Sequence, residues 1–450
     1  MSALALVLLS LVLAGSVWSR AGVDPNDWNV CLLAVGVLTA LHFGVNRRRG
    51  APKLDRLVTC SAAVLLIIPV LQILPIPLGF IRILSPARAA LIEAAAPFTG
   101  GPPRFASLSA VPFNTAQYVV TLAGCAAVIL LVRDIAYRTR GLPWAPVWPL
   151  LVIAGLEAVL GFYQAVAEGG LTFATGTYAN RDHFAGLLEI ALPFAALYPV
   201  AILQREKRRH ESPARPALLA CVLIAIAVIL LVGIIFSLSR MGFIVALASL
   251  FVSGSIVLTV RGWRVDYEDE SKRWRKWLPN IPLAFAIIFG FIFLPTDPLV
   301  ARFAEFARTD DISADTRAQI WRDSVSLVKD YPLTGCGFGT YESCFYRYKQ
   351  VAPMFTVDYA HNDYLQVLAE AGVIGFAAGL IFLLAILFRA VRGIVYARSI
   401  DSRFLNIACV ASITGILLHS LVDFNMYVPA NAMAFSWVLG IAALNSRSAG

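Results

Sequence analysis

The sequence predicts an all-α protein that crosses a membrane many times. Of its 450 residues, 59% are hydrophobic and only 14% are charged, and the mean hydropathy is +0.74. Soluble domains carry about 25% charged residues and about 45–50% apolar residues. The apolar residues are also gathered into long runs, with short clusters of basic residues between them. These observations exclude an ordinary cytosolic enzyme, a disordered chain and a secreted scaffold held by disulfides.

Twelve apolar segments each approach the roughly 20 residues that cross a bilayer as a helix. Helices are expected because lipid offers no partners to backbone amides. We therefore expect a single integral membrane domain over residues 1–450, with about 12 transmembrane helices. The first segment is interpreted as a span rather than a signal peptide, because no charged stretch precedes it. The predicted spans are 2–18, 28–45, 57–75, 114–132, 145–164, 184–203, 217–236, 241–260, 278–295, 371–388, 404–421 and 430–445.

The basic residues predict how these spans are oriented. Alternate connections and the C-terminal tail hold 24 of the 37 Lys and Arg residues. Of the other 13, seven lie in one long loop at 296–370, and long loops count little toward orientation. We expect the first set and both termini in the cytoplasm, and we expect no binding of nucleic acid. The connections in this set are 46–56, 133–144, 204–216, 261–277 and 389–403.

Four segments are then expected on the outer face. Residues 76–113 contain an amphipathic piece, 81–98, that is predicted to lie in the membrane interface. Residues 165–183 form a Gly/Thr-rich loop, and residues 237–240 a tight link between two helices. The 75-residue loop at 296–370 is too long for a passive connector, so we expect a periplasmic subdomain of short helices that carries part of the active site.

Arg240 is the most informative single residue. It interrupts an apolar stretch of 44 residues, 217–260, within the sequence Ser-Leu-Ser-Arg-Met-Gly. An arginine at membrane depth costs about 2.5–3.5 kcal/mol on insertion scales, so it usually faces a cavity or a partner. It is either an arginine that extends to the outer interface or part of an anion site, because its planar guanidinium matches phosphate oxygens.

Arg317 and Trp321 lie in the long loop and share a predicted helical face with Ile320 and Ser324. Arg317 either binds a ligand or pairs with Asp311 or Asp315 at the surface. Further along, residues 332–341 contain Gly335, Gly337 and Gly339. We interpret this segment as a tight turn that allows a close backbone approach, not as a nucleotide loop, because no strand–turn–helix context surrounds it.

His361 precedes the helix that re-enters the membrane. A lone histidine is often structural, but polar neighbours at a membrane boundary favour a general base. Ionisable residues inside predicted spans are functional candidates, or they pair with one another. Such residues share helical faces in three sets, namely Glu157 with Gly161 and Gln164, Asp182 with Gly186 and Glu189, and His419 with Asp423.

The cysteines and acidic residues suggest no cofactor. Most of the seven cysteines are expected to be small apolar residues in helices. Cys336 and Cys344 are eight residues apart on the oxidising side, so they form either a disulfide or two free thiols. No acidic metal cluster is evident, and we expect neither a metal ion nor another cofactor.

These motifs together resemble the O-antigen ligase/polymerase superfamily of bacterial envelope glycosyltransferases. The resemblance covers residues 150–435, and it depends on the order and membrane side of motifs that are each loose alone. One departure is Arg181-Asp182, where members often have Asn-Pro. The matching segments are 176–185, 237–242, Thr316-Arg317 with Trp321, 331–341, 361–365 with Glu370 and Gly372, His419 with Asp423-Phe424, and 429–432.

The resemblance implies a GT-C-like fold and a glycan donor carried on undecaprenyl diphosphate. The glycan would pass to a hydroxyl of a glycolipid or glycan acceptor, at the periplasmic face of the inner membrane, by inverting and metal-independent transfer. Arg240 and Arg317 match positions on the diphosphate, and His361 matches the position near the acceptor hydroxyl. The candidate substrate-binding residues are Arg181, His183, Trp321, Asn362, Tyr364 and Asp423.

Two alternatives remain open at this stage. The motifs are shared by ligases, which cap an acceptor, and by polymerases, which extend the glycan on its carrier. Twelve spans with both termini inside also suit a secondary transporter, although the two halves show no visible symmetry. The oligomeric state cannot be predicted from the sequence.

Overall fold

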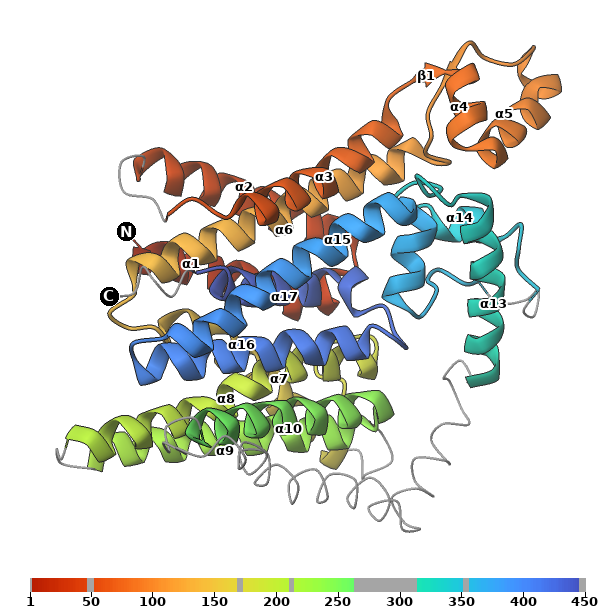
Figure 1. The fold of residues 1–450 in the computed structure, drawn as a ribbon. Coiled ribbons are helices and arrows are strands. Elements are labelled where there is room, and N and C mark those ends of the chain that lie inside the picture. Colours follow the sequence, from red (N-terminus) through yellow and green to blue (C-terminus); the bar gives the residue numbers. More distant parts are fainter. Residues whose placement is uncertain are drawn as a thin grey trace, which may run out of the picture.

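The described part of the protein is a helical bundle with helices gathered over one of its ends (Figure 1). The structure is a computed structural model that describes residues 2–46, 52–167, 173–209, 214–262, 314–350 and 356–444. Within these ranges the chain is helical, apart from one antiparallel pairing of β1 (Ile76–Pro77) with β2 (Phe105–Ala106). The all-α prediction is confirmed for these residues.

Nine helices in the described ranges are long and apolar enough to cross a membrane, and α1 and α17 are shorter apolar helices. Eleven of the twelve predicted segments coincide with these helices, whereas 278–295 lies outside the described residues. The eleven helices are α1 (Ser2–Trp18), α2 (Pro25–Val45), α3 (Arg56–Ile73), α6 (Pro112–Arg138), α7 (Trp148–Ala167), α8 (Arg181–Arg209), α9 (Ala214–Ser237), α10 (Arg240–Gly262), α15 (Asp363–Tyr396), α16 (Ile400–His419) and α17 (Pro429–Ala442).

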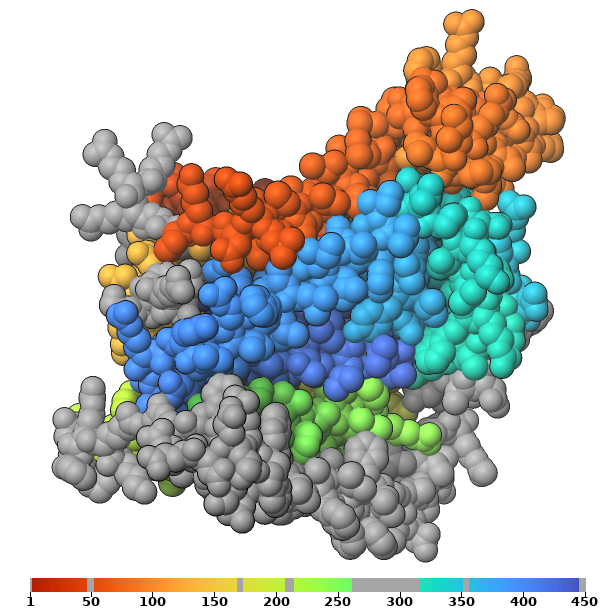
Figure 2. Space-filling view, viewed as in Figure 1, coloured from red at the N-terminus to blue at the C-terminus, as the bar shows by residue number. Residues whose placement is uncertain are grey.

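Helix α8 forms the centre of the bundle. Of the 18 residues of α8 that best suit a membrane span, 78% are buried. The helix packs against α9 and α16. The peripheral helices instead leave large apolar side chains exposed, such as Leu33 in α2 and Leu218 in α9. Figure 2 shows α3 and α15 running side by side along one face. An apolar outer face of this kind is stable in hydrocarbon and would be costly in water.

Four short helices lie together beyond one end of the bundle, on the right in Figure 1. They are α4 (Leu78–Leu84), α5 (Pro86–Thr99), α13 (Ala314–Asp330) and α14 (Tyr341–Phe345). The amphipathic piece predicted as one unit is two helices, because the chain turns at Ser85 ahead of Pro86. A residue before proline is disfavoured in the α conformation, which explains the break. Its place in the membrane interface stays a prediction.

The segments predicted to share one membrane face lie at the same end of the bundle. The amide of Ala174 donates to the carbonyl of Phe236, which joins the 165–183 loop to the end of α9. The amide of Ala110 donates to the carbonyl of Cys336, which joins the 76–113 segment to the long loop. The start of α1 and the end of α17 lie at the opposite end (Figure 1). The described connecting segments thus lie at the ends of the bundle to which the predicted order of spans assigns them.

A backbone clamp fastens the long loop to α15. Helix α15 is interrupted at Gly372, where φ is +63°, and the turn at 332–339 lies against this break. Val373 donates its amide hydrogen to the carbonyl of Pro332, and Cys336 donates to the carbonyl of Ala369. A Cβ on Gly372 would lie 2.3 Å from the carbonyl oxygen of Leu333. The close backbone approach predicted for this turn is therefore confirmed.

We expect Gly372→Ala to destabilise the protein by about 1–3 kcal/mol, because alanine would add both a positive-φ penalty and a clash with Leu333. Gly155→Ala in α7 is the matched control, since a Cβ there meets no atom within 4 Å. Thermal unfolding of the two purified variants in detergent would test this. Equal melting temperatures for both variants would contradict the clamp.

Candidate active site

The first turn of α8 carries two residues of the site, Asp182 and His183. Side chains of α7 hold the loop that precedes this turn. The carboxylate of Glu157 accepts hydrogen bonds from the backbone amide and hydroxyl of Thr177, at 2.8 and 3.0 Å. The side-chain amide of Gln164 donates to the carbonyl of Gly176 at 2.8 Å. The polar face predicted on this helix therefore fixes the loop before α8, and with it the position of Asp182.

Arg317 joins the long loop to the bundle. Its Nη2 lies 3.8 Å from Oδ2 of Asp182, and its Nη1 donates to the carbonyl of Val422 at 3.3 Å. The two surface partners considered for Arg317 were Asp311 and Asp315, and residue 311 and the side chain of Asp315 lie outside what the structure describes. Among the described side chains, the carboxylate of Asp182 lies beside Arg317. The side chain of Arg317 is 23% exposed, so it is only partly buried.

The backbone at His361 is strained and held in place by neighbouring side chains. Its φ is +49°, a conformation that few residues other than glycine adopt. The indole of Trp321 donates to the carbonyls of Ala360 and His361, at 3.0 and 3.3 Å. Asn362 caps α15 by accepting the amide hydrogens of Tyr364 and Leu365. Strain of this kind persists only where the surroundings impose it, and it is often found at functional sites.

Asp423 lies at the centre of three histidines. Its Oδ1 is 3.6 Å from Nδ1 of His361 and 3.7 Å from Nε2 of His183, and its Oδ2 is 3.8 Å from Nε2 of His419. These distances are longer than hydrogen bonds, so the contacts are electrostatic. The ring of Phe424 packs against the edges of His183 and His361, which holds both imidazoles near the carboxylate.

The charge state of Asp423 follows from these neighbours. The residue is 2% exposed. Burial by itself raises the pKa of a carboxyl group, but the nearby histidines outweigh this, and the pKa of Asp423 lies well below its usual range. The carboxylate is therefore negatively charged at neutral pH.

A second layer of ionisable residues lies beneath Asp423. The carboxylate of Glu189 in α8 contacts Nδ1 of His419 in α16 at 3.0 and 3.2 Å. Asp363 at the start of α15 accepts hydrogen bonds from the hydroxyl of Ser420 and the amide of Met426. The sequence marked Glu189 and His419 as candidates within spans, but it did not place them or Asp363 in the site. Their position inside apolar runs was the available signal.

Arg240 is at the rim of this end of the bundle. It begins α10, and its side chain is exposed. Two buried serines shape the turn before it, since Ser237 accepts the amide hydrogen of Ser239, and Ser239 accepts that of Gly242. A Cβ on Gly242 would lie 2.8 Å from that of Ala185, so this turn packs on the first turns of α8. Arg240 therefore lies outside the buried centre of the cluster, which consists of histidines and carboxylates.

The other predicted substrate-binding residues have partners within the protein. The guanidinium of Arg181 stacks over the ring of Phe173 at 4.9 Å. The hydroxyl of Tyr364 donates to the carbonyl of Leu417, and the side-chain amide of Asn362 donates to that of Leu421. Asn362 and Tyr364, together with Trp321, anchor the segment around His361. Contact of any of these residues with a substrate stays a prediction.

Cys336 and Cys344 are free thiols in the structure, and both are buried. The hydroxyl of Thr340 lies 3.2 Å from one sulfur and 3.8 Å from the other. Beside them, Glu370 accepts hydrogen bonds from the amide of Tyr341 and the hydroxyl of Tyr427. This carboxylate therefore ties the turn, α15 and the α16–α17 link together.

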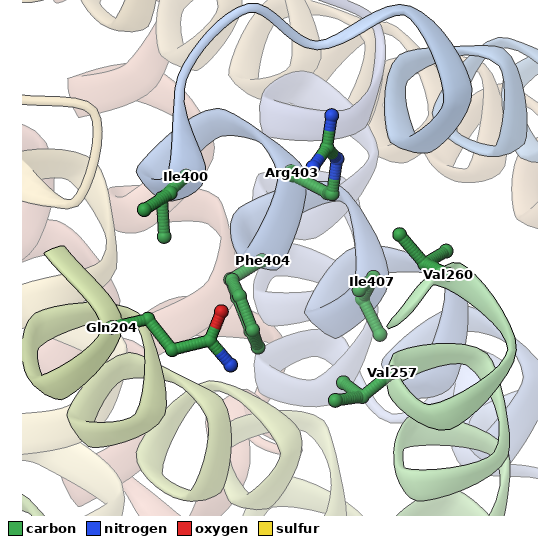
Figure 3. A pocket seen from close by; sticks show the side chains of 7 residues that line it. All are labelled: Gln204, Val257, Val260, Ile400, Arg403, Phe404 and Ile407. Carbon is green, nitrogen blue, oxygen red and sulfur yellow. The ribbon is translucent and has the colours of Figure 1, made fainter. Parts of the chain in front are cut away.

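Two cavities lie away from the histidine cluster. The one in Figure 3 lies between α8, α10 and α16, and its volume of about 40 Å³ holds only a few waters. Its Gln204 follows Glu189 by 15 residues in α8, about 22 Å along the helix axis. In Figure 3 the head of Arg403 points away from the cavity, and it donates to the carbonyls of Ile394 and Ala397. A larger cavity of about 260 Å³ has almost wholly apolar walls, where α3, α4 and α15 meet.

A comparison with known protein families matches one segment of the chain. Residues 225–380, about a third of the chain, match the family model described as O-antigen ligase. This segment of the chain is similar to the O-antigen ligase/polymerase superfamily. No curated protein matches it. The matched segment of this O-antigen ligase-like protein includes Arg240, Arg317 and His361. It begins after His183 and Glu189, and it ends before His419 and Asp423.

The lowered pKa of Asp423 predicts how the stability of the O-antigen ligase-like protein depends on pH. Because the folded state holds this carboxylate below its ordinary pKa of about 3.9, the stabilisation is complete above about pH 4 and is lost as the pH falls further. Asp423→Asn should therefore lower the melting temperature at pH 7. The deficit relative to wild type should shrink between pH 4 and pH 3, and a deficit that is constant down to pH 3 would show that the charge is not responsible.

Proposed function

We propose that the protein is a membrane glycosyltransferase. It would move a glycan from undecaprenyl diphosphate to a sugar hydroxyl of an acceptor, at the periplasmic face of the bacterial inner membrane. The observation that carries this proposal is the convergence of Arg317 and His361 on the α16–α17 link, at one end of an apolar bundle. Arg317 bonds to Val422, and His361 faces the adjacent Asp423.

The reaction needs stabilisation of charge more than activation of the donor. A lipid diphosphate is already a good leaving group, but negative charge develops on it as the bond to the sugar breaks. Arg317 is partly exposed and Arg240 is exposed at the same end of the bundle, so both are available to phosphate oxygens. Charge-assisted hydrogen bonds contribute about 1.5–3 kcal/mol each. In this mechanism the arginines take the place of a metal cation.

The acceptor hydroxyl is a weak nucleophile, and His361 is the proposed base. Its Nδ1 faces Asp423, which leaves Nε2 for a substrate hydroxyl. The same arrangement of carboxylate, imidazole and hydroxyl activates nucleophiles on unrelated folds. Direct displacement assisted by one base would invert the anomeric centre, whereas retention would require a carboxylate nucleophile at the donor carbon.

The location follows from the distribution of charge. The described parts of the segments rich in Lys and Arg lie at the end of the bundle opposite the cluster, and these segments are expected in the cytoplasm. The cluster would then face the periplasm, where a finished lipid-linked glycan would be available. The GT-C-like fold, the exact number of spans and the periplasmic subdomain at 296–370 belong to the same proposal.

A ligase and a polymerase would use this site in the same way, and they differ in the acceptor. We favour a ligase, which transfers a finished glycan to a glycolipid. A polymerase is the second candidate, because the family match does not distinguish the two, and this match favours either over a transporter. Purified protein would be given undecaprenyl-diphosphate glycan together with core glycolipid and a second donor molecule. Product on the glycolipid supports a ligase, longer glycan on the carrier supports a polymerase, and no product without an ion gradient contradicts both.

Substitution of the arginines should reduce transfer. Arg317→Lys keeps a positive charge but loses the planar fork, and Arg240→Ala loses the charge, so each should lower kcat/KM at least about tenfold. Arg82→Ala is the matched control, since Arg82 lies in α4 at the same end and pairs with Glu93 on an exposed surface. Full activity of Arg240→Ala in folded protein would contradict its role at the diphosphate.

His361→Ala should lose turnover more than donor binding. General base catalysis typically contributes about 100-fold to 10,000-fold, so kcat should fall by at least about 100-fold while the donor KM changes little. Steady-state kinetics with the purified enzyme would measure both constants. If kcat were unchanged, another residue would have to remove the proton.

A further inference from the structure

Glu189 and His419 form a buried pair that the proposed chemistry does not use. Glu189 is 1% exposed and His419 is 0% exposed, and both lie among apolar side chains between α8 and α16. Charged groups buried in this way are retained only when they are paired and bonded. The pair reaches the site through one contact, the 3.8 Å between Nε2 of His419 and Oδ2 of Asp423.

The geometry favours a positive charge on His419. Its Nδ1 faces the oxygens of Glu189, and its Nε2 faces Asp423, so a carboxylate lies at each ring nitrogen. A neutral imidazole carries a hydrogen on one nitrogen only, whereas an imidazolium can donate from both. Glu189, His419 and Asp423 then form a row of alternating charge, negative, positive and negative, that leads from the core to His361.

We propose that Glu189 and His419 are positioning residues for His361, because they hold the Asp423 carboxylate so that it orients Nδ1 of His361. This inference rests on the proposed glycosyl transfer. Glu189 keeps His419 protonated, and the protonated ring draws on one oxygen of Asp423. The other oxygen faces His361 and also His183. Asp423 therefore orients His361, while the positive charge on His419 partly offsets the electrostatic effect of this carboxylate on His361.

The step that this arrangement serves is a single displacement. The hydrogen of the acceptor hydroxyl passes to Nε2 of His361, while the hydroxyl oxygen forms a bond to the anomeric carbon. The bond between that carbon and the diphosphate oxygen breaks, and its electron pair leaves with undecaprenyl diphosphate. His361 is then an imidazolium beside Asp423, and loss of its proton to solvent returns it to the neutral form.

Other charged groups lie around this carboxylate, and they are left unchanged by the substitutions proposed below. His183 of α8 lies 3.7 Å from it, and the amide of Asp363 in α15 donates to the carbonyl of Asp423 at 3.2 Å. Asp182 of α8 and Arg317 of α13 pair with each other, and Arg317 bonds to the neighbouring carbonyl of Val422.

The test compares the pH dependence of kcat/KM in two variants of the full-length enzyme in detergent. Glu189→Gln removes a negative charge, and His419→Gln removes a positive one. If Glu189 acts through His419, both variants remove the positive charge beside Asp423, because His419 becomes neutral in one and is absent in the other. The negative charge of Asp423 then acts on His361 without this offset. The acid limb should then move to higher pH by about one unit in both, and activity should recover at alkaline pH. A direct effect of each charge would move the two limbs in opposite directions.

The matched control is the buried pair of His42 and Asp134 at the other end of the bundle, with Nε2 and Oδ2 2.7 Å apart. Asp134→Asn should lower the melting temperature and leave the pH profile as in wild type. An unchanged profile in folded Glu189→Gln, or a shift to lower pH, would overturn the inference. Should Glu189→Gln fail to fold, the profile of His419→Gln decides. Wild-type protein that transfers no glycan would instead contradict the proposed function before any variant is compared.

Discussion

A carboxylate buried in an apolar helix bundle has to be surrounded by donors and positive charge, and Asp423 imposes this requirement on the end of this protein. Its three histidines come from α8, from the residue before the cap of α15 and from the end of α16. Three segments that are distant in sequence must therefore meet at one point. The burial of α8, the cap of α15 and the short α16–α17 link together hold these three segments around Asp423.

The exposure of the charged groups changes gradually across this end of the bundle. Arg240 is exposed, Arg317 and His361 are partly exposed, and Asp423, His419 and Glu189 are buried. In the proposed chemistry the outer groups meet the substrate, and the inner groups hold the outer ones in position. The arrangement also explains why the inner residues are ionisable although they contact no solvent.

The spans could be predicted from the sequence because hydropathy is a property of each segment alone. Eleven predicted segments coincide with described helices. Arg317 is a candidate because of its helical spacing in the long loop, and His361 because of its polar neighbours at a membrane boundary, in both cases together with the family resemblance. The pairing of Glu189 with His419 could not be predicted, because 230 residues separate them and helical periodicity relates residues within one helix only. The break at Ser85 was predictable from Pro86, but the amphipathic pattern concealed it.

The clamp between the 332–339 turn and the break in α15 has a consequence for how such proteins diversify. Its hydrogen bonds run between main-chain atoms, and its close contacts require an absence of side chains at Gly335 and Gly372. Gly337 and Gly339 in the same turn also have positive φ, whereas the exposed residue Leu333 takes part through its main chain only. Related proteins could therefore exchange much of the surface that meets the acceptor and still dock it in the same place, so recognition of new sugars could evolve without rebuilding the transmembrane scaffold.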